Sequence, residues 1–253
     1  MIDILKARLR QGHRTSKYPG AEPVMPERFR GLPVLHPEKC ESGCRACADV
    51  CPTGAILPGP PLRLDLGACV FCPACAEACP TGAVAFSTDY QLAARKRSDL
   101  LLGEEGLRKV GALDEKMRKL FGRSLKLRQV SAGGCNACEA DINVLSTIVF
   151  DLGQFGIQVV ASPRHADGIL VTGPVTENMR TALLDTYAAV PDPKLVIALG
   201  ACAISGGLFA ESPEQHRGVE TFLPVDLYIP GCPPHPMTIL DGLLRMLGRI
   251  DKK

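Results

Sequence analysis

The sequence predicts a small α+β domain rich in cysteine, followed by a larger α/β domain built on a parallel β-sheet. Eight of the twelve cysteines stand in two runs of four between residues 40 and 79. From residue 125 onward, short apolar runs typical of buried strands alternate with segments of helical periodicity. A chain of 253 residues has room for two such domains.

Charge divides the chain further. Residues 1–39 carry eight Lys and Arg against four Asp and Glu, and residues 91–128 carry eleven against five, whereas the remaining segments are net acidic. We therefore expect four parts: an N-terminal amphipathic helix and extended arm in residues 1–39, the cysteine-rich domain in 40–90, a basic helical linker in 91–124 and the α/β domain in 125–253.

The N-terminal part combines two patterns. Its first ten residues place apolar side chains among basic ones, which predicts a short amphipathic helix that lies on a membrane or on a partner subunit. Five prolines in residues 19–37 then predict an extended arm. The first twenty residues lack the apolar region of a secretory signal. With no run of eighteen apolar residues, we expect no transmembrane segment.

The basic stretches suggest partners with acidic surfaces or anionic lipid head groups. For residues 91–128, a solvated helix face explains the charge equally well. Nucleic acid is not an expected partner, because the chain has no Trp, four Tyr and no basic stretch interleaved with aromatic residues.

The cysteine spacing points to iron–sulfur chemistry. The runs are Cys40, Cys44, Cys47 and Cys51, then Cys69, Cys72, Cys75 and Cys79. Each run has three closely spaced cysteines followed by a fourth in a Cys-Pro pair, which is typical of iron–sulfur ligation. The alternative, a structural zinc site, needs two Cys pairs separated by a longer spacer. The segment CPTGAI at residues 51–56 matches CPTGAV at 79–84, which indicates a duplicated half-domain.

These runs resemble those of bacterial ferredoxins, which bind two [4Fe–4S] clusters with crossed ligation. The resemblance implies that one cluster takes Cys40, Cys44, Cys47 and Cys79, and that the other takes Cys51, Cys69, Cys72 and Cys75. Cys40 and Cys44 are separated by three residues instead of two. A three-iron cluster is therefore an alternative at the first site.

The C-terminal part reads as strands separated by helices, which predicts a parallel sheet covered on both faces. The expected strands are residues 125–130, 158–161, 168–172, 195–199 and 226–229, and the expected helices are 140–151, 178–190 and 236–247. In such sheets, ligands bind beyond the carboxyl ends of the strands.

The remaining cysteines lie at those strand ends, each near glycine. Cys135 and Cys138 follow the first expected strand, and Cys202 and Cys232 follow the fourth and fifth. Four thiolates that converge from three loops can hold a third [4Fe–4S] cluster. The alternative is that Cys202 and Cys232 are ordinary buried residues.

On these motifs, the C-terminal half resembles the small subunit shared by energy-converting [NiFe] hydrogenases and complex I. The N-terminal half, with the arm PVMPERFRGLPVLHPEKC, is similar to the two-cluster subunit of the same assemblies. In formate hydrogenlyase-type complexes these two subunits are usually separate proteins, so the resemblance implies that this chain is a fusion of the two. The expected fold is thus an α+β ferredoxin-like 2[4Fe–4S] domain followed by an α/β parallel-sheet domain of flavodoxin-like type.

Two residues separate Cys135 from Cys138, as in the hydrogenase branch, whereas complex I has adjacent cysteines here. Glu139 also fits that branch, or is simply a carboxylate favoured at a helix start. All cysteines are assigned to clusters, so the resemblance implies that nickel is bound by a large partner subunit. We expect an electron-transfer subunit of an oxidoreductase, peripheral on the cytoplasmic face of the membrane.

The expected partners are the large subunit, a membrane-arm subunit and an electron-donor or electron-acceptor protein. One alternative is the same subunit in a complex I-like quinone oxidoreductase or in a nickel-free relative of hydrogenase. The others are a zinc-loaded scaffold or nucleic-acid-binding module, and a free-standing ferredoxin-like carrier.

Overall fold

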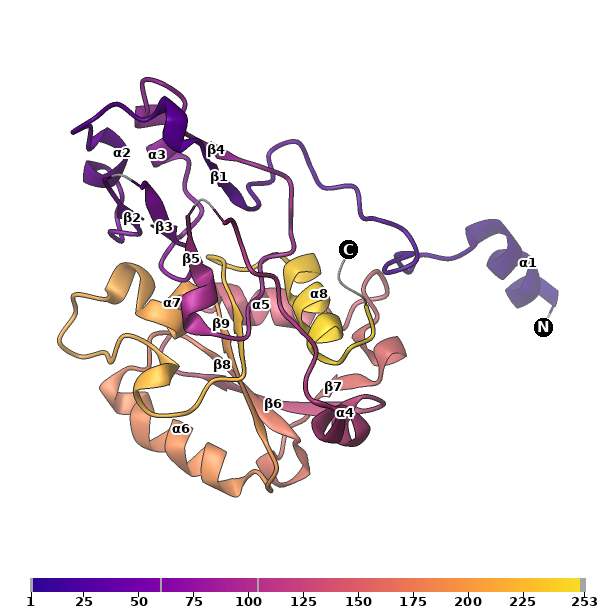
Figure 1. The fold of residues 1–253 in the computed structure, drawn as a ribbon. Coiled ribbons are helices and arrows are strands. Elements are labelled where there is room, and N and C mark those ends of the chain that lie inside the picture. The colour runs from indigo at the N-terminus through magenta and orange to yellow at the C-terminus, as the bar shows by residue number, and fades with distance from the viewer. Residues whose placement is uncertain (1, 60, 104, 251–253) are drawn as a thin grey trace.

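The computed structural model describes residues 2–59, 61–103 and 105–250 (Figure 1). Its largest sheet has five parallel strands in the order β10-β9-β8-β6-β7. Their bounds are β6 (Leu125–Ser131), β7 (Ile157–Val159), β8 (Gly168–Thr172), β9 (Leu195–Leu199) and β10 (Leu227–Ile229). All five expected strands are present, so the prediction of a parallel α/β domain is confirmed. Counted along the chain, the order is 2-1-3-4-5, that of flavodoxin-like sheets.

Both faces of this sheet are covered, as its apolar strands require. Ile169 packs in one core cluster with Leu183 of the surface helix α6 (Glu177–Ala189). Leu170, on the other face, packs in the second core cluster with Leu240 of the fully buried helix α8 (Pro236–Met246). The helices of this domain are α5 (Ala137–Val144), α6 (Glu177–Ala189), α7 (Ala201–Ser205) and α8 (Pro236–Met246). Short 3₁₀ turns lie at Leu152–Phe155, Pro163–His165, Gly207–Phe209 and Val219–Thr221.

The N-terminal half forms a small domain with two antiparallel sheets, β1-β4 and β2-β3-β5. Its elements are β1 (Pro33–Leu35), a 3₁₀ turn at Pro37–Lys39, α2 (Ala46–Asp49), β2 (Ile56–Leu57), β3 (Arg63–Asp65), α3 (Ala74–Ala78), β4 (Val84–Phe86) and β5 (Leu101–Leu102). The outer strands β1 and β5 lie beyond the predicted limits of 40 and 90. The small domain therefore extends into both the predicted arm and the predicted linker.

The prediction of a helical linker over residues 91–124 is wrong for most of its length. Among the described residues of this segment, only the 3₁₀ turn Arg97–Leu100 and helix α4 (Glu115–Phe121) are helical. Ala94 instead forms an antiparallel bridge to Tyr228 of β10, with N–H···O distances of 3.0 and 2.9 Å. Tertiary pairing overrides the local preference because this segment is buried between the two domains. Helix α4 begins where the Asp114 carboxylate accepts from the Met117 N–H at 3.0 Å.

The two domains share one hydrophobic core. A single cluster of buried residues includes Leu64 and Leu100 from the small domain together with Val130, Ile169 and Ala203 from the α/β domain. In Figure 1 the small domain lies next to α7 and the neighbouring loops, at one end of the strands of the large sheet. The position of the small domain is therefore set by packing rather than by a flexible tether.

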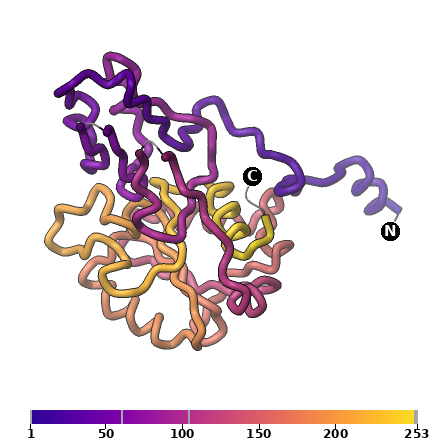
Figure 2. Tube along the Cα trace, in the orientation of Figure 1, coloured from indigo at the N-terminus to yellow at the C-terminus, as the bar shows by residue number. Residues whose placement is uncertain are grey.

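Helix α1 (Ile2–Gln11) contributes no side chain to either core. Figures 1 and 2 show it apart from the rest of the molecule, at the end of the arm. No helix among the described residues combines the length and apolarity needed to cross a bilayer.

Candidate iron–sulfur cluster site

The first group of cysteines, Cys40, Cys44, Cys47 and Cys79, lies around α2. The buried thiol of Cys47 lies within electrostatic reach of Cys79 and Cys40. Cys79 ends the second sequence run, so the fold brings it across to the first. Helices α2 and α3 pack against each other and make this exchange possible.

The second group has the reciprocal composition: it combines the last cysteine of the first run with three of the second run, namely Cys51 with Cys69, Cys72 and Cys75. The Cys69 thiol lies within electrostatic reach of Cys75, Cys51 and Cys72, and the Cys75 thiol within reach of Cys72 and Cys51. Burial raises the pKa of Cys69 to about 12 and that of Cys75 to about 11. Metal loading at these thiols must therefore release protons that the bare site holds tightly.

The sequence repeat is also a structural repeat. The Ala55 N–H donates to Cys51 Sγ at 3.3 Å, and the Ala83 N–H donates to Cys79 Sγ at 3.1 Å. The hydroxyls of Thr53 and Thr81 lie 3.8 and 3.7 Å from the same two sulfurs. Burial alone would raise the pKa of Cys79, but the Thr81 hydroxyl and nearby backbone N–H groups lower it. Each CPTGA segment is thus a loop that donates hydrogen bonds to its own cysteine sulfur.

The third group gathers at the carboxyl edge of the large sheet, as the sequence predicted. Cys135 and Cys138 follow β6, Cys202 lies on α7 after β9, and Cys232 follows β10. The Cys138 thiol interacts electrostatically with the other three, and Cys202 with Cys232 and Cys135. Cys135 and Cys232 are exposed, so this group opens at the protein surface.

Glycines leave room for these sulfurs. At Gly200, which has φ +88°, an added Cβ would lie 2.7 Å from Cys138 Sγ. At Gly207, an added Cβ would lie 2.9 Å from Cys202 Sγ. The donor set is all thiolate in each group, and thiolates are the usual ligands of iron–sulfur clusters. Within the described residues, no three metal-binding side chains converge on the position of a single ion. The all-cysteine donor sets, with glycines that leave room beside the sulfurs of the third group, fit iron–sulfur clusters.

A buried carboxylate lies beside the third group. Glu139, in the first turn of α5, accepts hydrogen bonds at its Oε1 from Ser131 Oγ at 2.6 Å and Thr172 Oγ1 at 2.5 Å. Burial would raise the pKa of Glu139, but the two hydroxyls and its own backbone N–H lower it. Sequence analysis singled out Glu139 and missed Ser131 and Thr172. Their position as the last residues of β6 and β8 was the available signal.

The segments that carry the second and third groups contact each other. Ser205 Oγ on α7 donates to the Gly67 carbonyl at 3.2 Å, close in sequence to Cys202 and Cys69. An added Cβ at Gly67 would lie 2.7 Å from Ile204 Cγ2, so the backbones approach closely here. Sequence reasoning did not find this contact, because nothing in either segment marks its partner.

A further contact joins the N-terminal arm to the second cysteine run. Arg30 Nε donates to the Phe71 carbonyl, within the second cysteine run, at 2.7 Å. A cavity of about 310 Å³ separates Phe71 from Cys232, and it is also lined by His235. His235 Nδ1 accepts from the Met237 N–H at 3.1 Å and thereby caps α8, while its ring packs edge-on against Phe29.

Comparison with known proteins identifies the C-terminal part. The family model of the NADH ubiquinone oxidoreductase 20 kDa subunit matches residues 135–246, which include the whole third group. The chain is 43% identical over 134 residues to a probable membrane-bound hydrogenase subunit, mbhJ, of Pyrococcus furiosus, covering 53% of this chain and 80% of that protein. It is 42% identical over 144 residues to formate hydrogenlyase subunit 7 of Escherichia coli, covering 57% and 56%.

Relatives also come from a quinone-reducing branch. The chain is 44% identical over 121 residues to NAD(P)H-quinone oxidoreductase subunit K of a Picosynechococcus species, covering 47% of this chain and 50% of that one. Among solved structures, a chain of an archaeal membrane-bound sulfane sulfur reductase matches with 32% identity and a TM-score of 0.47, over 54% of this chain and 75% of that one. On the extent and identity of the sequence matches, the chain belongs to the family of the NADH ubiquinone oxidoreductase 20 kDa subunit.

Proposed function

We propose that this chain is the electron-transfer subunit of a membrane-bound, [NiFe]-hydrogenase-like complex, with three [4Fe–4S] clusters that relay electrons to or from a large catalytic subunit. The observation that carries the proposal is the junction of the second and third cysteine groups across the Gly67–Ser205 contact. A relay requires neighbouring carriers held at fixed spacing, and the shared core of the two domains supplies the rigidity.

The residues that would hold the clusters are the three groups described above. When bound, the clusters supply one-electron donors and acceptors. The chain itself fixes their positions and donates N–H and O–H hydrogen bonds to the sulfurs, which favours the more negative, reduced state. The repeated CPTGA loops perform this task in the first two groups.

The partners follow from what each end of the relay exposes. The exposed Cys135 and Cys232 would face the large subunit, which would carry the nickel–iron site because every cysteine of this chain is already assigned. At the other end, a hollow of about 650 Å³ lined by Cys40 and Cys44 would hold the first cluster, and an electron-donor or electron-acceptor protein would dock over it. We further propose that the chain fuses the two-cluster ferredoxin-like subunit with the 20 kDa-type subunit, next to a membrane-arm subunit on the cytoplasmic face.

The hydrogenase branch is favoured by the two residues between Cys135 and Cys138 and by the buried Glu139. The second candidate is the equivalent subunit of a quinone-reducing or nickel-free complex, which the likeness to subunit K supports. Nickel analysis of the co-purified large subunit separates the two, since only the hydrogenase-like complex should contain nickel.

Anaerobic iron and sulfide analysis with low-temperature EPR of the dithionite-reduced protein tests the proposal. We expect about twelve iron and twelve sulfide per chain and the signals of interacting four-iron clusters. About eleven iron would indicate a three-iron cluster at the Cys40 site. Zinc with little sulfide would contradict the relay and support a structural scaffold instead.

Replacing Thr81 with Val should make the reduction potential of the first cluster more negative. The variant removes the hydroxyl 3.7 Å from Cys79 Sγ, and a lost hydrogen bond disfavours the reduced state. A hydrogen bond worth about 0.5–1.5 kcal/mol corresponds to a shift of roughly 20–60 mV for one electron. Potentiometric EPR titration measures the shift. Thr147→Val, which removes a hydroxyl bonded to the Val144 carbonyl, is the control, and an equal shift there would refute this assignment.

A further inference from the structure

Helix α1 exposes apolar side chains that the folded chain does not cover. Ile2, Leu5 and Leu9 are 68%, 63% and 84% exposed. Their spacing of three and seven residues places them on one face of the helix. Ile4 falls outside this stripe and is also exposed. Covering such a stripe with another apolar phase lowers the free energy, because it removes apolar surface from water.

Basic residues surround the stripe. On the helical wheel Lys6 borders it on one side and Arg8 on the other, and Arg10, Arg14 and Lys17 follow. Asp3 is the only acidic residue among positions 2–18. This segment therefore combines an apolar face with flanking basic side chains. A surface that binds it by charge complementarity must be negative.

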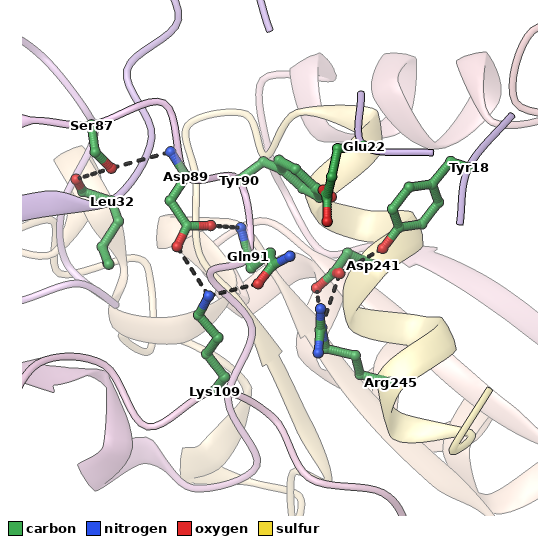
Figure 3. A network of polar contacts seen from close by, with 10 residues as sticks. All are labelled: Tyr18, Glu22, Leu32, Ser87, Asp89, Tyr90, Gln91, Lys109, Asp241 and Arg245. Atoms are coloured by element: carbon green, nitrogen blue, oxygen red, sulfur yellow. Dashed lines mark hydrogen bonds and ion pairs between the residues drawn. The ribbon is translucent and has the colours of Figure 1, made fainter. Parts of the chain in front are cut away.

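The C-terminal end of this basic segment, at Tyr18, is attached to the α/β domain, as Figure 3 shows. The buried Tyr18 hydroxyl donates to Asp241 Oδ1 on α8 at 2.7 Å, and Arg245 Nε donates to the same carboxylate at 2.9 Å. The Tyr18 ring also packs edge-on against Tyr90. The arm is thus held at a defined place on α8, and helix α1 extends from it.

A second contact joins the arm to an apolar loop. The Ser16 N–H donates to the Val149 carbonyl at 2.8 Å. Ile148 and Val149, in the loop after α5, are 70% and 45% exposed. Two exposed apolar features therefore lie at opposite ends of the basic segment: the stripe on α1 at its outer end and this loop at its base.

We propose that α1, with the loop at Ile148 and Val149, binds the surface of an anionic phospholipid bilayer. The helix lies in the head-group layer, with its leucines at the acyl boundary and its lysine and arginines extended to the lipid phosphates. A bilayer fits better than an acidic protein groove, because head groups accept cations on both sides of the stripe at once. Because Tyr18 and Ser16 attach this segment to α8 and to the loop after α5, that side of the molecule then faces the membrane.

This site is independent of the proposed redox function, since it contains none of the cysteines. The full chain, purified anaerobically with its metal content measured, is sedimented with vesicles of phosphatidylcholine alone or mixed with phosphatidylglycerol. We expect binding to the anionic vesicles, little to the neutral ones, and loss of binding in about 0.5 M salt, where charges are screened within a few ångströms.

Two variants test the apolar and basic features separately. Leu5→Glu with Leu9→Glu should weaken binding at least about tenfold. Lys6→Gln with Arg10→Gln should weaken it about 25-fold, since each lost charge costs about fivefold. The matched controls are Leu120→Glu, a leucine 53% exposed on α4, and Lys96→Gln with Lys116→Gln. Both controls should bind as the native chain does.

Three results would overturn the proposal: no sedimentation with anionic vesicles, equal binding to neutral vesicles, or unchanged binding in the leucine variant. Iron content is read in every sample. Failure of lipid binding with full iron refutes this inference alone, whereas lipid binding without iron refutes the redox proposal alone.

Discussion

Replacing Cys232 with Ser is expected to remove the third cluster and leave the first two in place. Cys232 belongs to a group drawn only from the segments that follow β6, β9 and β10, and the other eight cysteines lie in the small domain. Iron should fall by about a third, from about twelve to about eight atoms per chain. EPR of the reduced protein should retain the coupled signal of the first two clusters and lose the third.

The reciprocal variant, Cys44→Ser, is the control for this result. Cys44 lies in the small domain, far along the chain from the third group, so its loss should affect the first cluster and spare the third. A loss of all three signals in either variant would contradict the assignment of separate groups. It would instead mean that one cluster is needed for the common core to form, because metal binding and folding are coupled.

Replacing Gly200 with Ala should remove the third cluster although all four cysteines remain. Gly200 has φ +88° and ψ 157°, a region that only glycine adopts readily, and an added Cβ would lie 2.7 Å from Cys138 Sγ. The backbone strain costs about 1–3 kcal/mol, and the methyl group must also displace the sulfur. We expect loss of the third EPR signal, a lowered melting temperature and free thiols that react with a thiol reagent.

Gly106→Ala is the matched control. Gly106 also has a positive φ, +70°, but nothing lies within 4 Å of its added Cβ. This variant should lose about 1–2 kcal/mol of stability from backbone strain alone and keep all its iron. If both variants lost the third cluster equally, the contact between Gly200 and Cys138 would not be the cause.

The large sheet could be predicted because its signals are local. The runs at 168–172 and 195–199 are entirely apolar up to their last residues, as strands buried on both faces must be, and their bounds match β8 and β9. The same logic placed Cys135, Cys138, Cys202 and Cys232 together, since parallel strands end at one edge. The ends of α5 were less predictable: the helix stops at Val144, although the apolar pattern continues to 151.

The small domain was harder to delimit, because its outer strands are short and come from distant segments. β1 lies in the predicted arm and β5 in the predicted linker, and each has only two or three residues. Strands of this length carry almost no periodicity, so only their pairing partners identify them. Leu100 and Leu102 fall within the predicted helical linker, yet both lie in the shared core, and Leu102 pairs with Leu64 of β3.

The sequence by itself determined that the candidate ligands are cysteines, that eight of them fall into two runs, and that the C-terminal part forms a parallel α/β sheet. These features depend on spacing and periodicity, which are properties of neighbouring residues. Only the tertiary structure decided that Gly67 meets Ser205 beside the third group and that Tyr18 binds Asp241 on α8. These contacts join residues 138 and 223 positions apart. Their free energy comes from burial and from hydrogen bonds that form only when both segments are already in place, so no local pattern encodes them.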